Sequence, residues 1–551
     1  MKGPKQKLSR SKKYYYLILL VVLAIGIFLR TYHFHDWLRF DFDQVRDAEV
    51  ITSVMDGGKS LPLLGPKAGG TEFKLGPIFY YFQYISARVF GNFPDKLAYP
   101  DLFFSILTMP LLFFFLKKYF NDKISLVLTA LYSVSFYAVK YSRFAWNPNS
   151  TPFFYLLFLF SLLQLVSSKS TRKIVWAISA GIALGIGVQL HSLFLLTAPF
   201  IFIAFVGYFI KNKQLNWKMA FTVISVAVIL NTPQIISEIQ KHGANTKDFF
   251  GAITTKSNGE QTSILSKVLL DGNCHVQANG MLVSALGYDS RCRFIEPNEL
   301  GTQFNEEKSL GNAAGTLSVI TVILVTVFSL GGYFLLGYFL KKEKNSEKKN
   351  FLGLITLSSA IFFLILLPLA NEIIMRFFLV LGFLPFVLLG FWIKFLNNRV
   401  KYGFIVSILL VTAVAGTNAL MVKNSFASPY ADHEPKREGA LESITLAEEE
   451  FLVRFINSHN NPSSIAYIED EKNDFTRYLR ALTYLAQKEK IKIVPITQKN
   501  QPNKQAQYFS IDLNTGAKPD SNSQSEALRN YSVIDSASFG RFSVTLFAPK
   551  Q

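Results

Sequence analysis

The sequence predicts an all-α polytopic membrane domain, followed by a small α/β domain, from three observations. The chain has 551 residues, of which 50% are hydrophobic and 15% are aromatic. Apolar runs of about 20 residues recur along its first three quarters, and each can cross a bilayer core of roughly 30 Å. The last part of the chain is polar and alternates short strand-like and helix-like patterns.

The basic residues lie where a membrane protein needs them. The net charge is +19, but most lysines and arginines fall in short loops between apolar runs, where they set the orientation of the chain. Residues 1–13 carry six basic residues and no acidic one, so we expect a cytoplasmic N-terminus. The same distribution gives no reason to expect nucleic-acid binding.

The apolar runs predict eleven transmembrane helices. Basic loops alternate with uncharged ones along these runs, and the loop 341–349 alone holds five lysines. The segment Pro77–Gly91 is apolar but short and ends near Arg88, so we expect it to be interfacial or re-entrant. Counting it as a span would place the later basic loops outside. The predicted spans cover about 14–29, 101–116, 124–142, 152–167, 174–190, 193–210, 217–233, 315–340, 351–370, 375–396 and 403–422.

This topology divides the chain into two domains in a plasma (inner) membrane. Residues 1–422 form the transmembrane domain. Residues 31–99 are its first extracytoplasmic loop, with interfacial helices, and 234–314 are a second long extracytoplasmic loop. Residues 423–551 form an extracytoplasmic α/β domain.

The predicted C-terminal domain has recognisable elements. "SIAYIE", "IKIVPI" and "SVTLFA" read as strands, while "LAEEEFLVRFIN" and "DFTRYLRALTYLAQK" read as helices. The preceding "FASPYADHEPKREG" contains two prolines and many charges, and we expect a hinge there.

The only two cysteines, Cys274 and Cys292, both lie in the loop 234–314. A disulfide is permitted outside the cytoplasm, and we predict that the two residues are bridged; two unrelated thiols are the alternative. No Cys-x-x-Cys or His/Cys ligand spacing indicates structural zinc.

Ionisable and amide side chains gather at the extracytoplasmic ends of the predicted spans. Ionisable groups at a membrane boundary are functional candidates by default. Their placement on one side predicts a shared cavity. The residues are Asp43, Arg46, Asp47, Glu49, Glu72, Lys74, Arg143, Asn147, His191 and Arg376.

Such a cavity suits one kind of chemistry. A carboxylate can take a proton from a hydroxyl acceptor, and cationic groups can stabilise a departing phosphate. A site at headgroup level fits a substrate whose tail stays in lipid, such as a polyprenyl-phosphate sugar. No P-loop and no dinucleotide-binding glycine motif is present, so nothing indicates binding of ATP, a sugar nucleotide or NAD.

Each of these residues also has a purely structural interpretation. Asp43 could be the N-cap of an interfacial helix, "QVRDAEVITSVMD". Lys74 could be a snorkelling anchor, and Arg143 and Arg376 could contact lipid headgroups. His191 could be a satisfied polar residue at a helix end, and "WNPN" could be only a turn.

Asp43 and Asp47 are four residues apart, which places two like charges on one helix face. This pairing requires a cation, and Arg46 or a metal ion could supply it. Asp43, Asp47 and Glu49 are candidate ligands of a divalent cation, although no ligand spacing demands one and no cofactor is established.

Two stretches resemble a known family. "DQVRDAEV", followed by "EFKLGPIFYYFQYISARVFGNFPDKLAYPDLFF", is similar to the first outer loop of glycosyltransferases of the C superfamily. The likeness is to the protein O-mannosyltransferases (glycosyltransferase family 39) and the lipid A aminoarabinose transferases, and it covers residues 14–170 best. Gln44 stands where that family has glutamate, Asp47 where it has an aromatic residue, and "LGP" where it has two prolines. These departures affect the positions from which a metal site or a sugar preference of that family would be inferred.

The resemblance implies roles for individual residues. Asp43 matches the catalytic aspartate, and Lys74, Arg376 and Arg46 would hold the donor phosphate. The substrate and acceptor would be lined by Asp47, Glu49, Glu72, Arg143, Asn147 and His191.

The sequence therefore predicts an integral-membrane glycosyltransferase that moves a sugar, with inversion, from a polyprenyl phosphate to a protein, lipid or glycan acceptor outside the cytoplasm. A polysaccharide polymerase or ligase that uses diphosphate-linked glycans is one alternative. A lipid-linked sugar transporter is another, although the spans carry few charges near their centres. A non-enzymatic assembly protein is a third.

Overall fold

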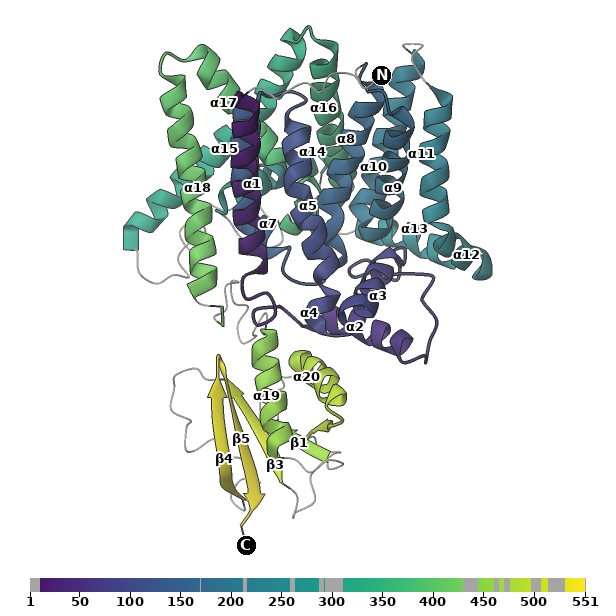
Figure 1. The fold of residues 1–551 in the computed structure, drawn as a ribbon, viewed down its shortest axis with the longest axis vertical. Coiled ribbons are helices and arrows are strands. Elements are labelled where there is room, and N and C mark those ends of the chain that lie inside the picture. The colour runs from purple at the N-terminus through teal and green to yellow at the C-terminus, as the bar shows by residue number, and fades with distance from the viewer. Residues whose placement is uncertain are drawn as a thin grey trace.

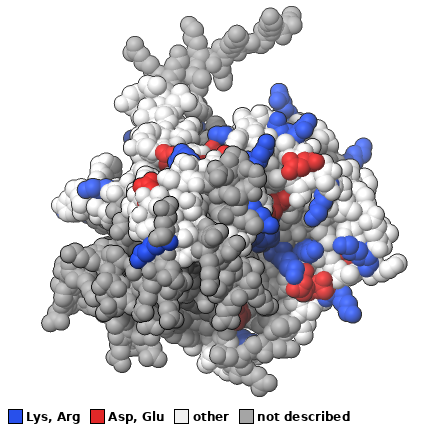
Figure 2. Space-filling model, turned by 90° about the horizontal axis from the view of Figure 1, so that it is seen from below, with Lys and Arg blue, Asp and Glu red and all other residues white. Residues whose placement is uncertain are grey.

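A computed structural model describes residues 10–168, 170–211, 216–257, 263–286, 292, 311–427, 429–430, 444–459, 465–469, 476–496, 507–513 and 531–550. A bundle of long helices stands on a small sheet with two helices (Figure 1). The short helices α2, α3 and α4 lie at the end of the bundle that faces the sheet, and we call this end the loop end. Figure 2 shows the molecule from below, where basic and acidic side chains are both visible at the surface.

The helices follow the apolar runs of the sequence. Their bounds are α1 Arg10–Thr31, α2 Phe42–Met55, α3 Ile78–Phe90, α4 Pro94–Leu97, α5 Tyr99–Leu116, α6 Asp122–Ser133, α7 Phe136–Lys140, η1 Asn147–Ser150, α8 Thr151–Val166, α9 Lys173–Leu190, α10 Ser192–Lys211, α11 Trp217–Leu230, α12 Thr232–Gln240, α13 Ala244–Ser257, α14 Ile264–Ser284, α15 Gly311–Lys342, α16 Ser346–Leu366, η2 Leu367–Glu372, η3 Met375–Leu381, α17 Leu384–Arg399, α18 Gly403–Ala427, α19 Leu446–His459 and α20 Thr476–Lys488.

The polytopic helical fold is confirmed, but the predicted count of eleven spans is not. In the described part of the chain, eight helices are long and apolar enough to cross a membrane, or up to ten if each of two bent helix pairs is one span. The bends are 59° between α11 and α12 and 67° between η3 and α17. The predicted span 124–142 is divided into α6 and α7, and each piece is too short to cross alone.

The break between α6 and α7 is supported by polar side chains from other helices. The carbonyl of Ser133 accepts a hydrogen bond from Arg30 Nη1 at 2.8 Å, and the amide of Phe136 donates to Asn418 Oδ1 at 2.9 Å. Backbone groups freed in an apolar bundle need such partners. Hydropathy alone does not detect this break, because both pieces are apolar.

At the loop end, α2 begins at Phe42, and Asp41 is its N-cap. The interpretation of Asp43 as the N-cap is therefore wrong, because Asp43 lies in the first turn of α2. Helix α3 has only 13 residues and is followed by its C-cap, Gly91, whose φ of 103° suits glycine. Its length fits the interfacial or re-entrant helix that we predicted and is too short for a span.

Helices α13 and α14 lie within the predicted long loop 234–314, and α12 begins two residues before it. Helix α14 packs against α15, η2 and α17. Cys274 of α14 forms the predicted disulfide with Cys292, with a Cα–Cα distance of 5.7 Å. The amide of Cys292 donates to the carbonyl of Ile373 at 2.7 Å, which brings this part of the chain to the turn between η2 and η3.

The C-terminal part contains a five-stranded sheet in the order β2-β1-β3-β5-β4. Strand β1 is parallel to β2 and β3, and β5 is antiparallel to β3 and β4. The three predicted strands correspond to β1, β2 and β5, and the two predicted helices correspond to α19 and α20, whereas β3 and β4 were not predicted. The predicted hinge lies mostly outside the described residues. The strands are β1 Ile465–Glu469, β2 Lys492–Pro495, β3 Tyr508–Leu513, β4 Tyr531–Phe539 and β5 Phe542–Pro549.

The C-terminal part attaches to the loop end through backbone and side chains. The amide of Leu446, at the start of α19, donates to the carbonyl of Leu38 at 2.8 Å. Helix α20 packs on α2, and Tyr484 Oη lies 3.0 Å from Thr52 Oγ1. Helix α2 is therefore in contact with both the bundle and the C-terminal part.

Candidate active site at the loop end

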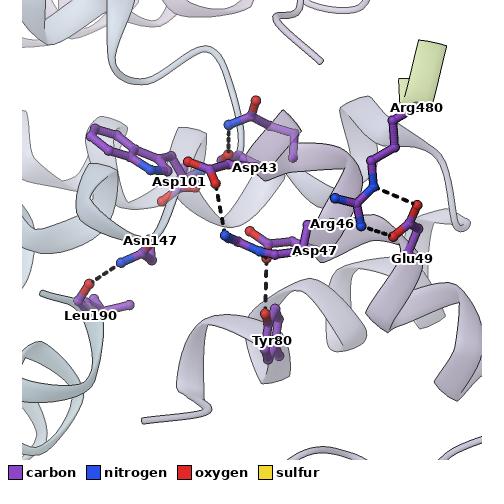
Figure 3. Close-up of polar contacts among 12 residues, drawn as sticks. Asp43, Arg46, Asp47, Glu49, Tyr80, Asp101, Asn147, Leu190 and Arg480 are labelled. Carbon is purple, nitrogen blue, oxygen red and sulfur yellow. Dashed lines mark hydrogen bonds and ion pairs between the residues drawn. The ribbon is translucent and has the colours of Figure 1, made fainter. Parts of the chain in front are cut away.

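Helix α2 brings three charged side chains together. Their spacing of three and four residues places Asp43, Arg46 and Asp47 on one helix face. Arg46 Nη1 donates to Asp43 Oδ1 at 2.9 Å, and Arg46 Nε donates to Asp47 Oδ1 at 2.8 Å (Figure 3). The cation that the two like charges required is therefore Arg46.

Asp47 is the closed member of this cluster. Its side chain is fully buried, and Tyr80 Oη of α3 donates to its Oδ1 at 3.1 Å. Its Oδ2 has no hydrogen-bond partner among the residues that the structure describes. Burial raises the pKa of Asp47 to about 7, although the charge of Arg46 opposes this shift. Burial, and next the charge of Asp47, raise the pKa of Tyr80, which therefore keeps its proton.

Asp43 is the open member of the cluster. Its side chain is 42% exposed, and it shares Arg46 with Asp47. Two carboxyl groups one turn apart thus differ in environment. Asp43 can meet a ligand, whereas Asp47 can act only through its neighbours.

The loop before α8 connects α2 to the rest of the site. Gln44 Nε2 donates to the carbonyl of Ala145 at 2.9 Å. The amide of Trp146 donates to Asp101 Oδ2 at 3.0 Å, and Ser150 Oγ donates to Asp101 Oδ1 at 2.5 Å. Asp101 is 1% exposed, so its carboxylate is committed to holding this loop.

The same loop contacts a second group of candidate residues. The guanidinium of Arg376 lies 5.1 Å from the centre of the Trp146 ring, a cation–π contact. Asn147 Nδ2 donates to the carbonyl of Leu190 at 2.6 Å, next to His191 (Figure 3). Burial, with a contribution from the charge of Arg376, lowers the pKa of His191 to about 4, so this imidazole is neutral at physiological pH.

Lys74 lies in the segment that leads into α3. Its backbone amide donates to Asn245 Oδ1 at 2.8 Å, and its carbonyl accepts from Asn245 Nδ2 at 2.9 Å. The amide of Ile78 donates to Gln189 Oε1 at 3.3 Å, close in sequence to His191. Among the described residues, no hydrogen bond or ion pair engages the Lys74 ammonium group, which is therefore available to a ligand.

Two predicted acidic residues have partners outside this cluster. Glu72 is exposed and pairs with Lys67 at 2.6 Å rather than with Lys74, and this hydrogen bond lowers its pKa. Glu49 pairs with Arg480 of α20, whose Nε lies 3.0 Å from Glu49 Oε1. Arg480 therefore brings the C-terminal part to the helix that carries Asp43.

Arg143 lies at the end of α1. All four hydrogen bonds described for its guanidinium go to carbonyls of residues 29, 30, 32 and 33. The carbonyls of residues 29 and 30 belong to the last turn of α1, which has no intrahelical partners for them. Arg143 also lies over the rings of Phe34, Trp37 and Phe426, so its described contacts hold the end of α1 in place.

The described residues contain no group of three or more His, Cys, Asp or Glu side chains that could hold a metal ion. Asp43 and Asp47, the candidate ligands, are bridged by Arg46.

Sequence reasoning missed four residues that shape this site. Asp101 begins the predicted span 101–116, and an acidic residue at the start of an apolar run is a signal for a buried polar role. Tyr80 and Trp146 lie in the quoted stretches "EFKLGPIFYY" and "WNPN", where nothing local marks them as site residues. Arg480 lies far along the chain in a different fold unit, and nothing local relates it to Glu49.

Residues 74–236 match the family described as dolichyl-phosphate-mannose-protein mannosyltransferase. This match covers less than half of the chain and includes Lys74, Asn147 and His191. A comparison with curated protein sequences gives no match.

Known structures share the fold. ArnT from Cupriavidus metallidurans bound to undecaprenyl phosphate matches with a TM-score of 0.51 and 10% identity, over 97% of this chain and 98% of that chain. The same protein in the apo state gives a TM-score of 0.50 and 10% identity, over 98% of both chains.

An oligosaccharyltransferase from Archaeoglobus fulgidus gives a TM-score of 0.47 and 12% identity, over 87% of this chain but only 62% of that longer chain. The family match and the ArnT fold together confirm the predicted resemblance to glycosyltransferases of the C superfamily.

Proposed function

We propose that this chain is an integral-membrane glycosyltransferase that transfers a sugar from a polyprenyl-phosphate donor to an acceptor hydroxyl, with inversion at the anomeric carbon. One observation carries the proposal. In a chain with the ArnT fold, the loop end holds an exposed carboxylate, Asp43, beside a buried one, Asp47, and Arg46 joins them. The family match over residues 74–236 supports a sugar attached to a lipid phosphate as the donor.

Asp43 is the general base in this proposal. Its exposed carboxylate can reach an acceptor hydroxyl, and its ion pair with Arg46 orients it. Asp47 cannot take this role directly because it is fully buried. It positions Arg46 instead, and Tyr80 holds it from the other side.

Cationic side chains would stabilise the leaving group. Lys74 has an ammonium group that is free among the described residues, and Arg376 is an exposed cation over Trp146. ArnT has been seen bound to undecaprenyl phosphate, and a ligand of that chemistry would meet these cations with its phosphate. Arg46 is the third candidate. The neutral His191 and the loop amide of Asn147 would then line the sugar or acceptor side.

The reaction is a single displacement. The acceptor oxygen attacks the anomeric carbon while its proton passes to Asp43. The bond from that carbon to the phosphate oxygen breaks, and the phosphate leaves with the electron pair, stabilised by Lys74 and Arg376. The products are the glycosylated acceptor and polyprenyl phosphate.

The site belongs on the extracytoplasmic face of the plasma membrane in this proposal. The basic loops of the sequence support a cytoplasmic N-terminus. The loop end, the segment 234–314 and the C-terminal α/β domain, residues 423–551, would then face outward. Acceptors on that side are proteins, lipids and surface glycans.

The proposal is tested with the purified full-length protein in proteoliposomes. Radiolabelled polyprenyl-phosphate hexoses are added together with crude cell envelope, and the labelled product is identified. Transfer of label supports the proposal. Transfer only from diphosphate-linked glycans indicates a polymerase or ligase, and movement of the labelled lipid across the bilayer without transfer indicates a transporter. Either result overturns the proposed function.

The Asp43→Asn variant tests the base assignment. The amide keeps the shape of the side chain but cannot accept the proton, so the transfer rate should fall at least about a hundredfold. The thermal unfolding midpoint should stay close to the wild-type value, because the Asp43 side chain is 42% exposed. A variant that transfers sugar at the wild-type rate contradicts the assignment.

A further inference from the structure

In the described part of the chain, one ion pair joins the C-terminal part to the helix that carries the proposed base. Arg480 of α20 donates from Nε to Glu49 Oε1 at 3.0 Å, and its Nη2 contacts Glu49 Oε2. Its guanidinium also lies 5.4 Å from the centre of the Phe42 ring. Phe42 is the first residue of α2, and Glu49 lies two turns later. Arg480 therefore spans the half of α2 that contains Asp43 and Asp47.

The order of charges along α2 makes this contact consequential. Arg46 lies three residues after Asp43 and three residues before Glu49, so both carboxylates are within its reach on a helix. In the structure Arg46 pairs with Asp43 and Asp47, and Glu49 pairs with Arg480. If Glu49 lost Arg480, its carboxylate would compete with Asp43 for Arg46.

We propose that Arg480 is a positioning residue of the candidate active site. By occupying Glu49, it leaves Arg46 to Asp43 and Asp47 and so holds the base in place from the C-terminal part of the chain. This inference rests on the proposed glycosyltransferase function and gives the C-terminal part a role in it. Arg480 acts through Glu49 and Arg46 and does not itself contact the reacting atoms.

The test uses the full-length protein in proteoliposomes and the radiolabelled polyprenyl-phosphate hexose that the wild type transfers. Arg480→Gln leaves the Glu49 carboxylate without its partner, and kcat should fall about tenfold or more because the base is displaced. KM for the donor should change less than about threefold, because the proposed phosphate contacts of Lys74 and Arg376 remain. The double variant Glu49→Gln/Arg480→Gln removes the competing carboxylate, and kcat should return to within about threefold of wild type.

The recovery separates positioning from simple docking. If Arg480 only fastened α20 to the bundle, the double variant would be at least as impaired as Arg480→Gln. Lys488→Gln is the matched control, because Lys488 is another cation of α20 that contacts the bundle, at the carbonyl of Asn92. Its charge interacts with Asp56, just after the end of α2, but it has no described contact with Asp43, Asp47 or Glu49, and its kcat should stay within about threefold of wild type.

The outcomes distinguish this inference from the proposed function. A wild-type protein without transfer activity refutes the function. An active wild type with an inactive Asp43→Asn variant supports the function, and the Arg480 variants then decide the inference alone. A fully active Arg480→Gln protein, or a double variant without recovery, overturns the positioning role. Thermal unfolding of each variant distinguishes a loss of transfer rate from a loss of fold.

Discussion

Asp43 and Asp47 show how one helix turn can separate two identical side chains. Both are paired with Arg46, but one is 42% exposed and the other is fully buried. Removal from water favours the protonated carboxyl group, so Asp47 has a raised pKa, about 7. The environment, and not the residue type, leaves Asp43 accessible to a ligand and Asp47 inaccessible to one.

The raised pKa of Asp47 predicts a pH dependence of stability. Its ordinary pKa in the unfolded chain is about 4, so the folded protein binds the proton more tightly. The bound proton makes its full contribution to the free energy of unfolding below about pH 4, and this contribution is lost as the pH rises through about 7. Asp47→Asn mimics the protonated form, so its unfolding midpoint should fall less than that of the wild type between about pH 5 and about pH 8. Parallel curves for the two proteins, measured by thermal unfolding, would contradict the shift.

Lys74 predicts a change in donor binding. Lys74→Ala should raise KM for the polyprenyl-phosphate sugar about tenfold or more, because a hydrogen bond to a charged group is worth roughly 1.5–3 kcal/mol. Lys67→Ala is a matched control in the same segment, since Lys67 pairs with the exposed Glu72. The measurement is initial rate against donor concentration. Equal KM values for the two variants would remove Lys74 from the donor site.

At the scale of elements, the short connections between helices position the candidate site residues as much as the long helices do. The loop between α7 and α8 contacts α2 through Gln44, α5 through Asp101 and η3 through Arg376. Proline and asparagine in "WNPN" produce a short 3-10 turn there, η1, in place of a continuous helix. An irregular segment at this position can meet three helices at once, which a straight span cannot do.

We expect the disulfide that begins in α14 to stabilise the fold. The bridge joins Cys274 to Cys292, which are 18 residues apart, and a loop of that length is stabilised by roughly 3 kcal/mol. Cys274→Ser/Cys292→Ser should therefore lower the unfolding midpoint while transfer at 25 °C continues, because neither cysteine is among the charged groups of the site. A reducing agent should lower the wild-type midpoint and leave that of the variant unchanged. A midpoint for the variant equal to that of the oxidised wild type would exclude this role.

At the scale of the whole molecule, the loop end and the C-terminal part form one assembly. Backbone bonds at the start of α19 and the side chains of α20 fasten the sheet unit next to α2. In the proposed function, the loop end supplies Asp43, Lys74 and Arg376, and the sheet unit supplies Arg480. The proposal therefore requires the loop end and the sheet unit to lie on the same side of the membrane.

The orientation of the molecule can be tested on intact cells with a membrane-impermeant maleimide. Val533→Cys places a thiol in the sheet unit, where Val533 is 60% exposed. Lys344→Cys places one in the basic loop at the opposite end of the bundle. Only Val533→Cys should be labelled before the membrane is permeabilised, because basic loops stay in the cytoplasm. The reverse pattern would refute an extracytoplasmic site.

The sequence by itself determined the properties that depend on local composition. Apolar length predicted a polytopic helical bundle, and spacing along the chain predicted a common face for Asp43, Arg46 and Asp47, because helix geometry is set locally. The pair of cysteines predicted their bridge, and residue patterns predicted three of the five described strands and both described helices of the C-terminal part. The resemblance to C-superfamily glycosyltransferases came from two motifs near the N-terminus.

Only the tertiary structure decided which carboxylate is exposed and which partner each charge takes. Burial of Asp47 depends on α3, the pairing of Glu49 depends on α20, and the cap of α1 by Arg143 depends on a distant loop. The break between α6 and α7 likewise depends on Arg30 and Asn418. Desolvation and ion pairing act between groups that are adjacent in space, and adjacency in space between residues far apart in the chain is not written in any local pattern.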